Sequence, residues 1–214
     1  GVSILQYRDK FRSPKQKIII AKELRNICNK FDSLLIINDD AKLAKKVGAN
    51  GVHLGQKDMP CEEARNILGP DSIIGISCQN NLSLAFNAQS EGADYVAFGS
   101  LFSTKSKADV LHCSLEDLTS FVKEIKIPSV AIGGINLRNF LTIKNSGVDM
   151  IAMSSGLFFE EDINLFHMES AALADICCPT IDCAKVKKLL GLRENFSCGN
   201  FAIMLSSTGS FSIS

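Results

Sequence analysis

The sequence lacks an excess of either charge, because its 214 residues contain 23 Lys plus Arg and 23 Asp plus Glu. Without net charge there is no overall field to attract nucleic acid or an anionic membrane surface. The sequence also has no apolar run approaching the ~18 residues that span a bilayer. We therefore expect neither nucleic acid nor membrane as a partner, and an anionic ligand has to be held by local groups.

Cysteines at paired, regular spacings are missing too, although the sequence has eight of them. Four are scattered along the first part of the chain, and no secretory signal is visible. The other four are closer together but lack the paired two-residue spacing of a structural zinc site. The two groups are Cys28, Cys61, Cys78 and Cys113, and Cys177, Cys178, Cys183 and Cys198. The sequence thus indicates reduced thiols and a cytoplasmic protein.

Two further signatures are absent. No Gly-x-Gly-x-x-Gly follows the first apolar run, which argues against a dinucleotide-binding fold. No Ser or Cys nucleophile with a matched base is apparent, so acyl transfer through a catalytic triad has no support. The histidines, His53, His112 and His167, stand in no metal-like spacing, and we assign none of them a catalytic role.

What the sequence does contain is an alternation of short apolar runs and longer amphipathic segments, which is typical of βα units around a parallel sheet. The predicted strands are residues 2–7, 34–37, 51–54, 73–76, 95–98, 129–132 and 150–153. The predicted helices are residues 14–30, 40–47, 60–68, 82–91, 115–125 and 137–145. These seven strands predict an α/β fold, a TIM (β/α)8 barrel whose first βα unit is missing from this chain.

A turn that repeats three times favours a barrel over an open doubly wound sheet. The near-repeats occupy residues 47–52, 91–96 and 146–151, each passing from a helix through Gly into a strand. We expect one barrel domain over residues 1–162, followed at 163–214 by a last helix and an atypical tail that is not an independent domain.

The two ends of the chain carry expectations of their own. Because the sequence begins at Gly1 inside a predicted strand, we expect an N-terminal truncation. The apolar run from Phe201 to Leu205 has the length of a strand, and one hypothesis places it in the gap that the missing first strand would leave.

In parallel barrels the chemistry lies in the loops that follow the strands, and all seven runs are followed by polar residues. At the end of the first run, the period of two places Gln6, Arg8 and Lys10 on one side of the strand. One face thus presents an amide and two cations, with a solvated strand end as the alternative.

Two neighbouring strands each deliver a carboxylate, Asp39 after the second and Asp58 after the third. Mg²⁺ usually takes one or two protein carboxylates and fills its octahedron with water and substrate phosphate. We therefore predict a Mg²⁺ site at Asp39 and Asp58. Asp40 is better explained as a helix cap, and capping is also the alternative for Asp58.

The later strands end in small and hydroxyl-bearing residues. The fourth ends at Ser77, and the fifth runs into a long loop with two lysines, a mark of a functional loop, although a surface loop without a role is the alternative. The last two are followed by Gly133 and Gly134 and by Ser154 and Ser155. Glycine allows backbone N–H groups to approach an anion, and a following helix N-terminus adds a favourable dipole, so we predict a phosphate site here; a plain tight turn is the alternative.

Taken together, these segments resemble thiamine phosphate synthase over roughly residues 1–162. The stretches that carry the resemblance are Gln6-Tyr7-Arg8-Asp9-Lys10, Ile36-Ile37-Asn38-Asp39, residues 51–58, Ile74-Gly75-Ile76-Ser77, residues 92–96 and residues 131–135. The most specific are His-Leu-Gly-Gln-x-Asp and Ile-Asn-Asp, whereas Ile-Gly-Gly-Ile occurs in many phosphate-binding barrels.

The resemblance implies a barrel enzyme that couples a hydroxymethylpyrimidine diphosphate to a thiazole phosphate and releases pyrophosphate. It implies that one set of residues binds the pyrimidine diphosphate: Gln6, Arg8, Lys10, Asn38, Ser77 and Lys107. It implies a second set for the thiazole phosphate: Thr104, Ser106, Gly133, Gly134, Ser154 and Ser155. Arg8, Lys10, Ser77 and Lys107 would be catalytic, and Asp39 and Asp58 would hold Mg²⁺.

In the family the pyrophosphate is thought to leave first, giving a pyrimidine carbocation that the thiazole nitrogen captures. Such chemistry needs charge stabilisation and positioning more than a protein nucleophile. The chain departs from the family in having Ser100 and Ser103 where Pro is usual, Ser106 in place of a frequent Thr, and an unrelated tail. Two alternatives stay open, a thiazole tautomerase on the same barrel and an inactive phosphate-binding fragment, as does a homo-oligomeric state.

Overall fold

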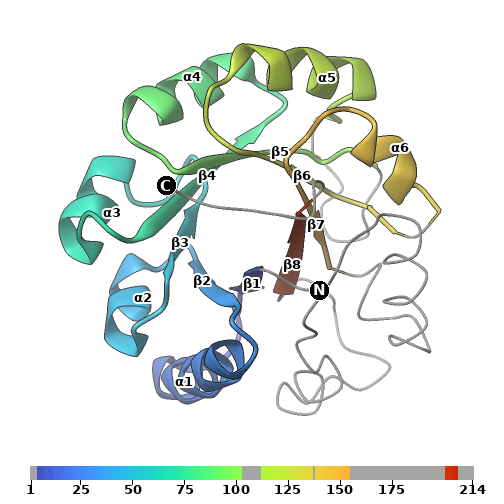
Figure 1. Ribbon diagram of the computed structural model, residues 1–214. Helices are drawn as coiled ribbons and strands as arrows, with labels where there is room; N and C mark the ends of the chain where they lie inside the picture. Colours follow the sequence, from blue (N-terminus) through green and yellow to red (C-terminus); the bar gives the residue numbers. More distant parts are fainter. Residues whose placement is uncertain (1–3, 103–111, 137, 155–200, 207–214) are drawn as a thin grey trace.

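The computed structural model of the chain describes residues 4–102, 112–136, 138–154 and 201–206. Seven parallel strands follow one another round a curled sheet, as the alternating pattern predicts (Figure 1). They are β1 (Ile4–Tyr7), β2 (Leu34–Asn38), β3 (Gly51–Leu54), β4 (Ile73–Gln79), β5 (Tyr95–Phe98), β6 (Ser129–Ile132) and β7 (Met150–Met153). The α/β fold expected from the sequence is confirmed.

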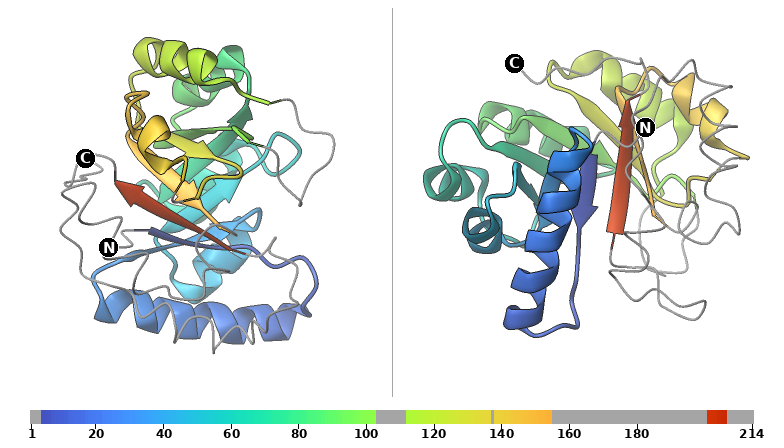
Figure 2. Two further views of the ribbon diagram at one scale, coloured as in Figure 1. Left: turned by 90° about the vertical axis from the view of Figure 1, so that its right-hand side faces the viewer. Right: turned by 60° about the horizontal axis from the view of Figure 1, so that its bottom comes forward.

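An eighth strand, β8 (Phe201–Ser206), lies between β7 and β1 and completes the order of a closed barrel. It pairs antiparallel with both neighbours, so that Phe201 stands opposite Tyr7 and Ile203 opposite Met153. Figure 2 shows β8 beside β1 and β7. The apolar run near the end of the sequence is therefore a strand in the gap beside β1, as the hypothesis had it. An all-parallel set of eight strands is not formed by the described residues.

Six helices in the described part of the chain cover the outside of the sheet (Figure 1). They are α1 (Pro14–Lys30), α2 (Ala41–Val47), α3 (Cys61–Leu68), α4 (Leu82–Ser90), α5 (Leu115–Glu124) and α6 (Phe140–Lys144). Local signals set several of their ends: Ser13 and Gln16 form a capping box at α1, and Ser114 and Asp117 form another at α5. At the end of α2, Gly48 adopts the left-handed conformation with φ 65° that favours glycine.

The seven parallel strands have buried residues on both faces and so divide the apolar core into two parts. The larger cluster lies between the sheet and the helices and includes Leu35, Ile37 and Val52. The smaller one fills the inside of the barrel with Ile4, Ile36, Ile73, Tyr95, Ala97, Val130, Met150 and Ala152. Because side chains alternate along a strand, Gln6, Asn38, His53 and Ser77 belong with this inner set.

Among the described residues, two elements differ from the sequence-based prediction by more than one residue at an end. β4 continues to Gln79 through a register shift between Ser77 and Gln79, so Ser77 lies within the strand and not after it. α6 begins at Phe140, later than predicted, because the side chains of Asn136 and Asn139 bond backbone N–H groups of the connecting segment.

The repeated turn has the same function at the base of the barrel each time. Asn50 accepts a hydrogen bond from the backbone N–H of Leu35 at 2.9 Å, Asp94 from that of Ile74 at 2.6 Å, and Asp149 from that of Ser129 at 2.8 Å. Each side chain ties the start of its own strand to the start of the preceding one. Among the described residues, no helix has the length and apolar character that a membrane crossing requires.

Candidate active site

The two carboxylates predicted to bind metal come together at the carboxyl ends of β2 and β3. Asp39 shares a side-chain hydrogen bond with Asp58, although each acid follows a different strand. Burial and the neighbouring Asp58 raise the pKa of Asp39, while Lys10 and Arg8 partly offset this by their positive charge. Four of the predicted site residues thus act on one another at a single place.

The backbone places Asp39 for this contact. Its φ of 66° lies in the left-handed region, which is uncommon for a residue with a side chain. Its N–H donates to the carbonyl of His53 at 2.8 Å, which ties the end of β2 to β3. The amide Nδ2 of Asn38 donates to Oδ1 of Asp39 and so orients the carboxylate. Asn38, predicted to bind the pyrimidine diphosphate, therefore also contacts a predicted metal ligand.

Asp58 is held from the other side by its own turn. Its Oδ2 accepts from the N–H of Gly55 at 2.7 Å, and the N–H of Asp58 donates back to the carbonyl of Gly55 at 3.0 Å. Helix α3 begins after Pro60 without any side-chain cap. The alternative that Asp58 caps this helix is therefore wrong, whereas Asp40 does cap α2, accepting from the N–H of Leu43 at 2.8 Å.

The cations beside the carboxylates come from the segment after β1. Arg8 is half-buried and Lys10 is exposed, and both lower the pKa of Asp39 by their charge. Asp9 between them is oriented differently, since its Oδ2 accepts from Arg12 at 2.6 Å and from the hydroxyl of Tyr7 at 3.2 Å. The alternation of the strand thus separates the candidate ligand-binding cations from a local ion pair.

The arrangement fits a Mg²⁺ ion. Two carboxylates in contact repel one another unless they share a proton or a cation, and oxygen ligands of this kind suit Mg²⁺. Among the described residues there is no group of three or more His, Cys, Asp or Glu that could hold a metal. A site with only two protein ligands would leave most of the octahedron to water and to a substrate phosphate.

Ser77 and the two glycines lie on strands further round the barrel. The carbonyl of Ser77 accepts from Nε2 of Gln56 at 2.7 Å, so the turn that carries Asp58 is bonded to β4. Gly133 packs against Ser100, since a Cβ there would lie 2.3 Å from the Ser100 Oγ, and its φ of 106° also favours glycine. Gly134 has a φ of 67°, and Ser154 is half-buried just after β7.

One part of the predicted phosphate site is wrong. Helix α6 has five residues and begins six positions after Gly134, so its N-terminus does not follow the glycines directly. The carbonyl of Gly134 accepts from Nδ2 of Asn139 at 3.1 Å instead. Any anion held at Gly133 and Gly134 would therefore depend on loop N–H groups and not on this helix dipole. Thr104, Ser106, Lys107 and Ser155 lie outside the described residues.

A buried polar cluster inside the barrel, below the carboxyl-end mouth where Asp39 and Asp58 lie, was not predicted from the sequence. Nδ1 of His53 lies 2.9 Å from the hydroxyl of Tyr95, and the two rings stack with centroids 5.6 Å apart. Gln6 also hydrogen-bonds the Tyr95 side chain. Gly75 makes room, because a Cβ there would lie 1.9 Å from Cζ of Tyr95. The signal was the strand period, which places His53 on the inner face.

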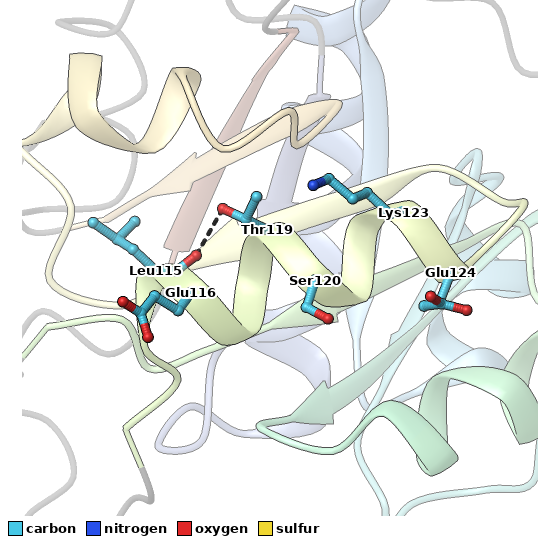
Figure 3. A pocket seen from close by; sticks show the side chains of 6 residues that line it. All are labelled: Leu115, Glu116, Thr119, Ser120, Lys123 and Glu124. Carbon is cyan, nitrogen blue, oxygen red and sulfur yellow. Dashed lines mark hydrogen bonds between the residues drawn. The ribbon is translucent and has the colours of Figure 1, made fainter.

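The thiols and the surface of α5 offer no competing site among the described residues. Cys28, Cys61, Cys78 and Cys113 are free and buried, and burial raises the pKa of each, to about 12 for Cys78. Such thiols are poor nucleophiles. Figure 3 shows a shallow depression on the outer face of α5, with Thr119 bonded to its own helix. It is lined by Leu115, Glu116, Thr119, Ser120, Lys123 and Glu124.

Fold and site together define a parallel α/β barrel protein that gathers two carboxylates, two cations and an amide at the carboxyl ends of its strands. This chain belongs to the thiamine monophosphate synthase family, whose model matches residues 1–157.

Individual relatives agree with this assignment. A thiamine-phosphate synthase of Thioalkalivibrio sulfidiphilus is 42% identical over 82% of this chain and 83% of the relative. One of Nitrosococcus oceani is 46% identical over 76% of this chain and 75% of its own length. The solved thiamine phosphate pyrophosphorylase of Pyrococcus furiosus covers 89% of this chain and 86% of its own, with 36% identity and a TM-score of 0.74.

Proposed function

We propose that this chain is a transferase of thiamine biosynthesis that condenses 4-amino-5-hydroxymethyl-2-methylpyrimidine diphosphate with thiazole phosphate. The products are thiamine phosphate and pyrophosphate. The observation that carries the proposal is the contact of Asp39 with Asp58 beside Arg8 and Lys10. Family membership supports the same reaction.

In the proposed reaction the bond between the pyrimidine methylene carbon and the diphosphate oxygen breaks with both electrons on oxygen. The thiazole nitrogen then donates its lone pair to that carbon, so the new C–N bond replaces the broken C–O bond. No protein nucleophile is needed. The task of the chain is to hold two anionic reactants close together and to stabilise the charge of the departing pyrophosphate.

Several residues of this chain have defined parts in that task. Arg8 and Lys10 would bind the diphosphate through charge-assisted hydrogen bonds. Asp39 and Asp58 would hold Mg²⁺, which when bound supplies positive charge that stabilises phosphate oxygens. Asn38 orients Asp39 through its amide, and the Gly55 N–H orients Asp58.

The thiazole phosphate would be held on the other side of the mouth. Gly133 and Gly134 on the segment after β6, with Ser154 after β7, are the described residues that we assign to it. Thr104, Ser106, Lys107 and Ser155 complete the proposed set from outside the described residues, with Lys107 and Ser77 on the diphosphate side. The proposed alkyl or aryl transfer requires that the two substrates are bound next to each other.

The wider expectations follow from the same proposal. Its partners are two small molecules, with no role for nucleic acid or a membrane, and we propose a cytoplasmic location and a (β/α)8-type barrel in which β8 stands in place of a parallel strand. A thiazole tautomerase would not need the diphosphate and Mg²⁺ groups, so the contact between Asp39 and Asp58 favours the synthase.

The test is to mix the purified chain with both phosphorylated substrates and Mg²⁺ and to quantify products. We expect thiamine phosphate and pyrophosphate in equal amounts, and turnover that stops when the metal is chelated. Release of a thiazole isomer alone would indicate a tautomerase instead. The absence of both thiamine phosphate and a thiazole isomer would indicate an inactive binding protein.

A further inference from the structure

The polar cluster beneath the mouth connects three strands across the inside of the barrel. Gln6 comes from β1, His53 from β3 and Tyr95 from β5, and all three are buried, with exposed fractions of 4%, 8% and 0%. The Tyr95 ring crosses the space left by Gly75 and brings its hydroxyl to Nδ1 of His53 at 2.9 Å. Gln6 bonds the same hydroxyl.

The Tyr95 hydroxyl links the other two members of this cluster. A hydroxyl has one donor and two acceptor sites, so it can bond His53 and Gln6 at the same time. Burial raises the pKa of Tyr95, and the hydrogen bond with Gln6 partly offsets this effect.

The bond to Tyr95 holds one end of the Gln6 amide and turns the other end away from Tyr95. An amide side chain has a donor end and an acceptor end of almost the same shape, and only its hydrogen bonds decide between the two orientations. A Gln6 amide bonded to Tyr95 therefore keeps one orientation, with its other end turned toward a ligand. Arg8 follows Gln6 by two positions on the same face of the strand, so the amide lies directly under the proposed diphosphate-binding cations.

We propose that Tyr95, supported by His53, is a positioning residue that fixes the orientation of the Gln6 amide beneath the mouth, where the amide binds the amino-bearing pyrimidine ring. This inference deepens the proposed function and rests on it. Neither Tyr95 nor His53 has to touch the reacting atoms. Their effect on the reaction passes through Gln6.

Tyr95→Phe is the direct test, because it removes one hydroxyl and keeps the ring that fills the space beside Gly75. We expect the Kd of the pyrimidine diphosphate, titrated with Mg²⁺ in the absence of the second substrate, to rise about five- to tenfold, the size of one net hydrogen bond. The KM of the thiazole phosphate should stay within about twofold. An unchanged Kd for the pyrimidine diphosphate would overturn the proposal.

The only other tyrosine provides the matched control. Tyr7 is equally buried, but its hydroxyl donates to Asp9 at 3.2 Å on the other face of β1. Tyr7→Phe should leave the Kd of the pyrimidine diphosphate as in the wild type. Equal losses in the two variants would mean that any buried hydroxyl supports the site, which contradicts a specific role for Tyr95.

A double-mutant cycle separates positioning from general damage. If Tyr95 acts through Gln6, adding Tyr95→Phe to Gln6→Ala should change the Kd by less than about twofold. Two effects that multiply would overturn the proposal. His53→Asn offers a check on folding and on the support that His53 gives to Tyr95. Because an amide can donate to or accept from the Tyr95 hydroxyl, we expect this variant to retain binding better than His53→Leu.

The proposed function and this inference fail in different ways. A wild-type chain that forms no thiamine phosphate would refute the function itself. A wild-type chain that turns over, with Tyr95→Phe indistinguishable from it in Kd, would refute only the role of Tyr95.

Discussion

The two ends of the barrel use the same kinds of residue for opposite purposes. At the base, Asp94 accepts from the N–H of Ile74 at 2.6 Å and from Arg65 at 2.7 Å, so its charge is compensated by the protein itself. At the mouth, Asp39 faces another carboxylate, and its pKa is raised. A carboxylate whose charge the protein compensates stabilises the fold, whereas one that faces a second carboxylate is expected to gain further compensation from a ligand.

Arginine side chains also bond the repeated turns at the base of the barrel. Arg65 reaches four acceptors around the second repeat, the carbonyls of Pro70, Ser72 and Gly92 and the carboxylate of Asp94. At the first repeat Arg25 donates to Asn50 at 2.7 Å. At the mouth, Lys10 and Arg8 act on Asp39 through their charge.

The largest effect should come from Asp39→Asn. Losing an outer hydrogen-bond partner of a metal ligand typically costs 10–100-fold, so losing a ligand itself should lower kcat/KM by about 100-fold or more. Stability should not fall. Because the pKa of Asp39 is raised in the folded state, its stabilising contribution is present below the unfolded pKa and is lost as pH rises through the folded pKa.

The matched control is Asp40→Asn, the same change one residue away. Asp40 caps α2, and Asn is an equally good cap, so both kcat/KM and the melting temperature should stay near the wild-type values. Steady-state kinetics and thermal unfolding of both variants make the comparison. Full turnover in Asp39→Asn would show that Asp39 is not a ligand of the metal.

At the base, the corresponding loss of a carboxylate is Asp94→Ala. It leaves the N–H of Ile74 and the guanidinium of Arg65 without their carboxylate, which should cost about 2–3 kcal/mol of unfolding free energy. For a chain of this size the melting temperature should drop by roughly 5–10 °C. The KM values at low temperature should not change. Asp71→Ala, on an exposed side chain nearby, should have little effect.

Between the two ends, His53 should make stability depend on pH. Its pKa is about 4 in the folded state and about 6.5 when unfolded, so its contribution is complete above pH 6.5 and is lost as pH falls toward 4. From pH 7 to pH 5 the loss should be roughly 2 kcal/mol.

Urea unfolding at both pH values measures this, in the wild type and in His53→Asn. The His53→Asn variant should not show the loss of unfolding free energy between pH 7 and pH 5 that is due to His53. The His112→Asn variant, at an exposed histidine, should show the same loss as the wild type. An identical pH dependence in wild type and His53→Asn would contradict a buried neutral ring.

The smallest effect should come from Gln56→Ala, which removes the bond to the Ser77 carbonyl at 2.7 Å. Because Gln56 is exposed, we expect about 1 kcal/mol or less in stability and a fall of a few-fold in kcat/KM as the Asp58 turn loosens. Gln79→Ala, at an exposed amide on the neighbouring strand end, is the control for kinetics and unfolding. Equal kinetics in the two variants would show that Gln56 does not support the turn that carries Asp58.

Much of the fold could be predicted because its signals are local. Gly51–Leu54, Tyr95–Phe98 and Ser129–Ile132 have the predicted bounds, since apolar runs and their flanking glycines mark buried strands. The start of α6 could not be predicted, because the hydrogen bonds from backbone N–H groups to the side chains of Asn136 and Asn139 compete with the first helical turn in a way that composition does not reveal.

The site was predictable to the extent that strand ends converge. Asp39 and Asp58 could be paired from their positions after neighbouring strands, but whether Asp58 caps a helix depended on the turn at Gly55. Tyr95 and His53 were missed because both fall in strands that read as apolar, and their contact spans 42 residues of sequence. The direction of β8 was likewise not encoded in its short apolar run.

The central claim is that Asp39 and Asp58 together make the mouth selective for an anion that arrives with a metal. Calorimetric titration with inorganic pyrophosphate, with and without Mg²⁺, measures this without any turnover. The wild type should bind pyrophosphate tightly only when Mg²⁺ is present, and Asp39→Asn combined with Asp58→Asn should bind it equally with or without the metal. Wild-type binding that ignores Mg²⁺ would contradict the account.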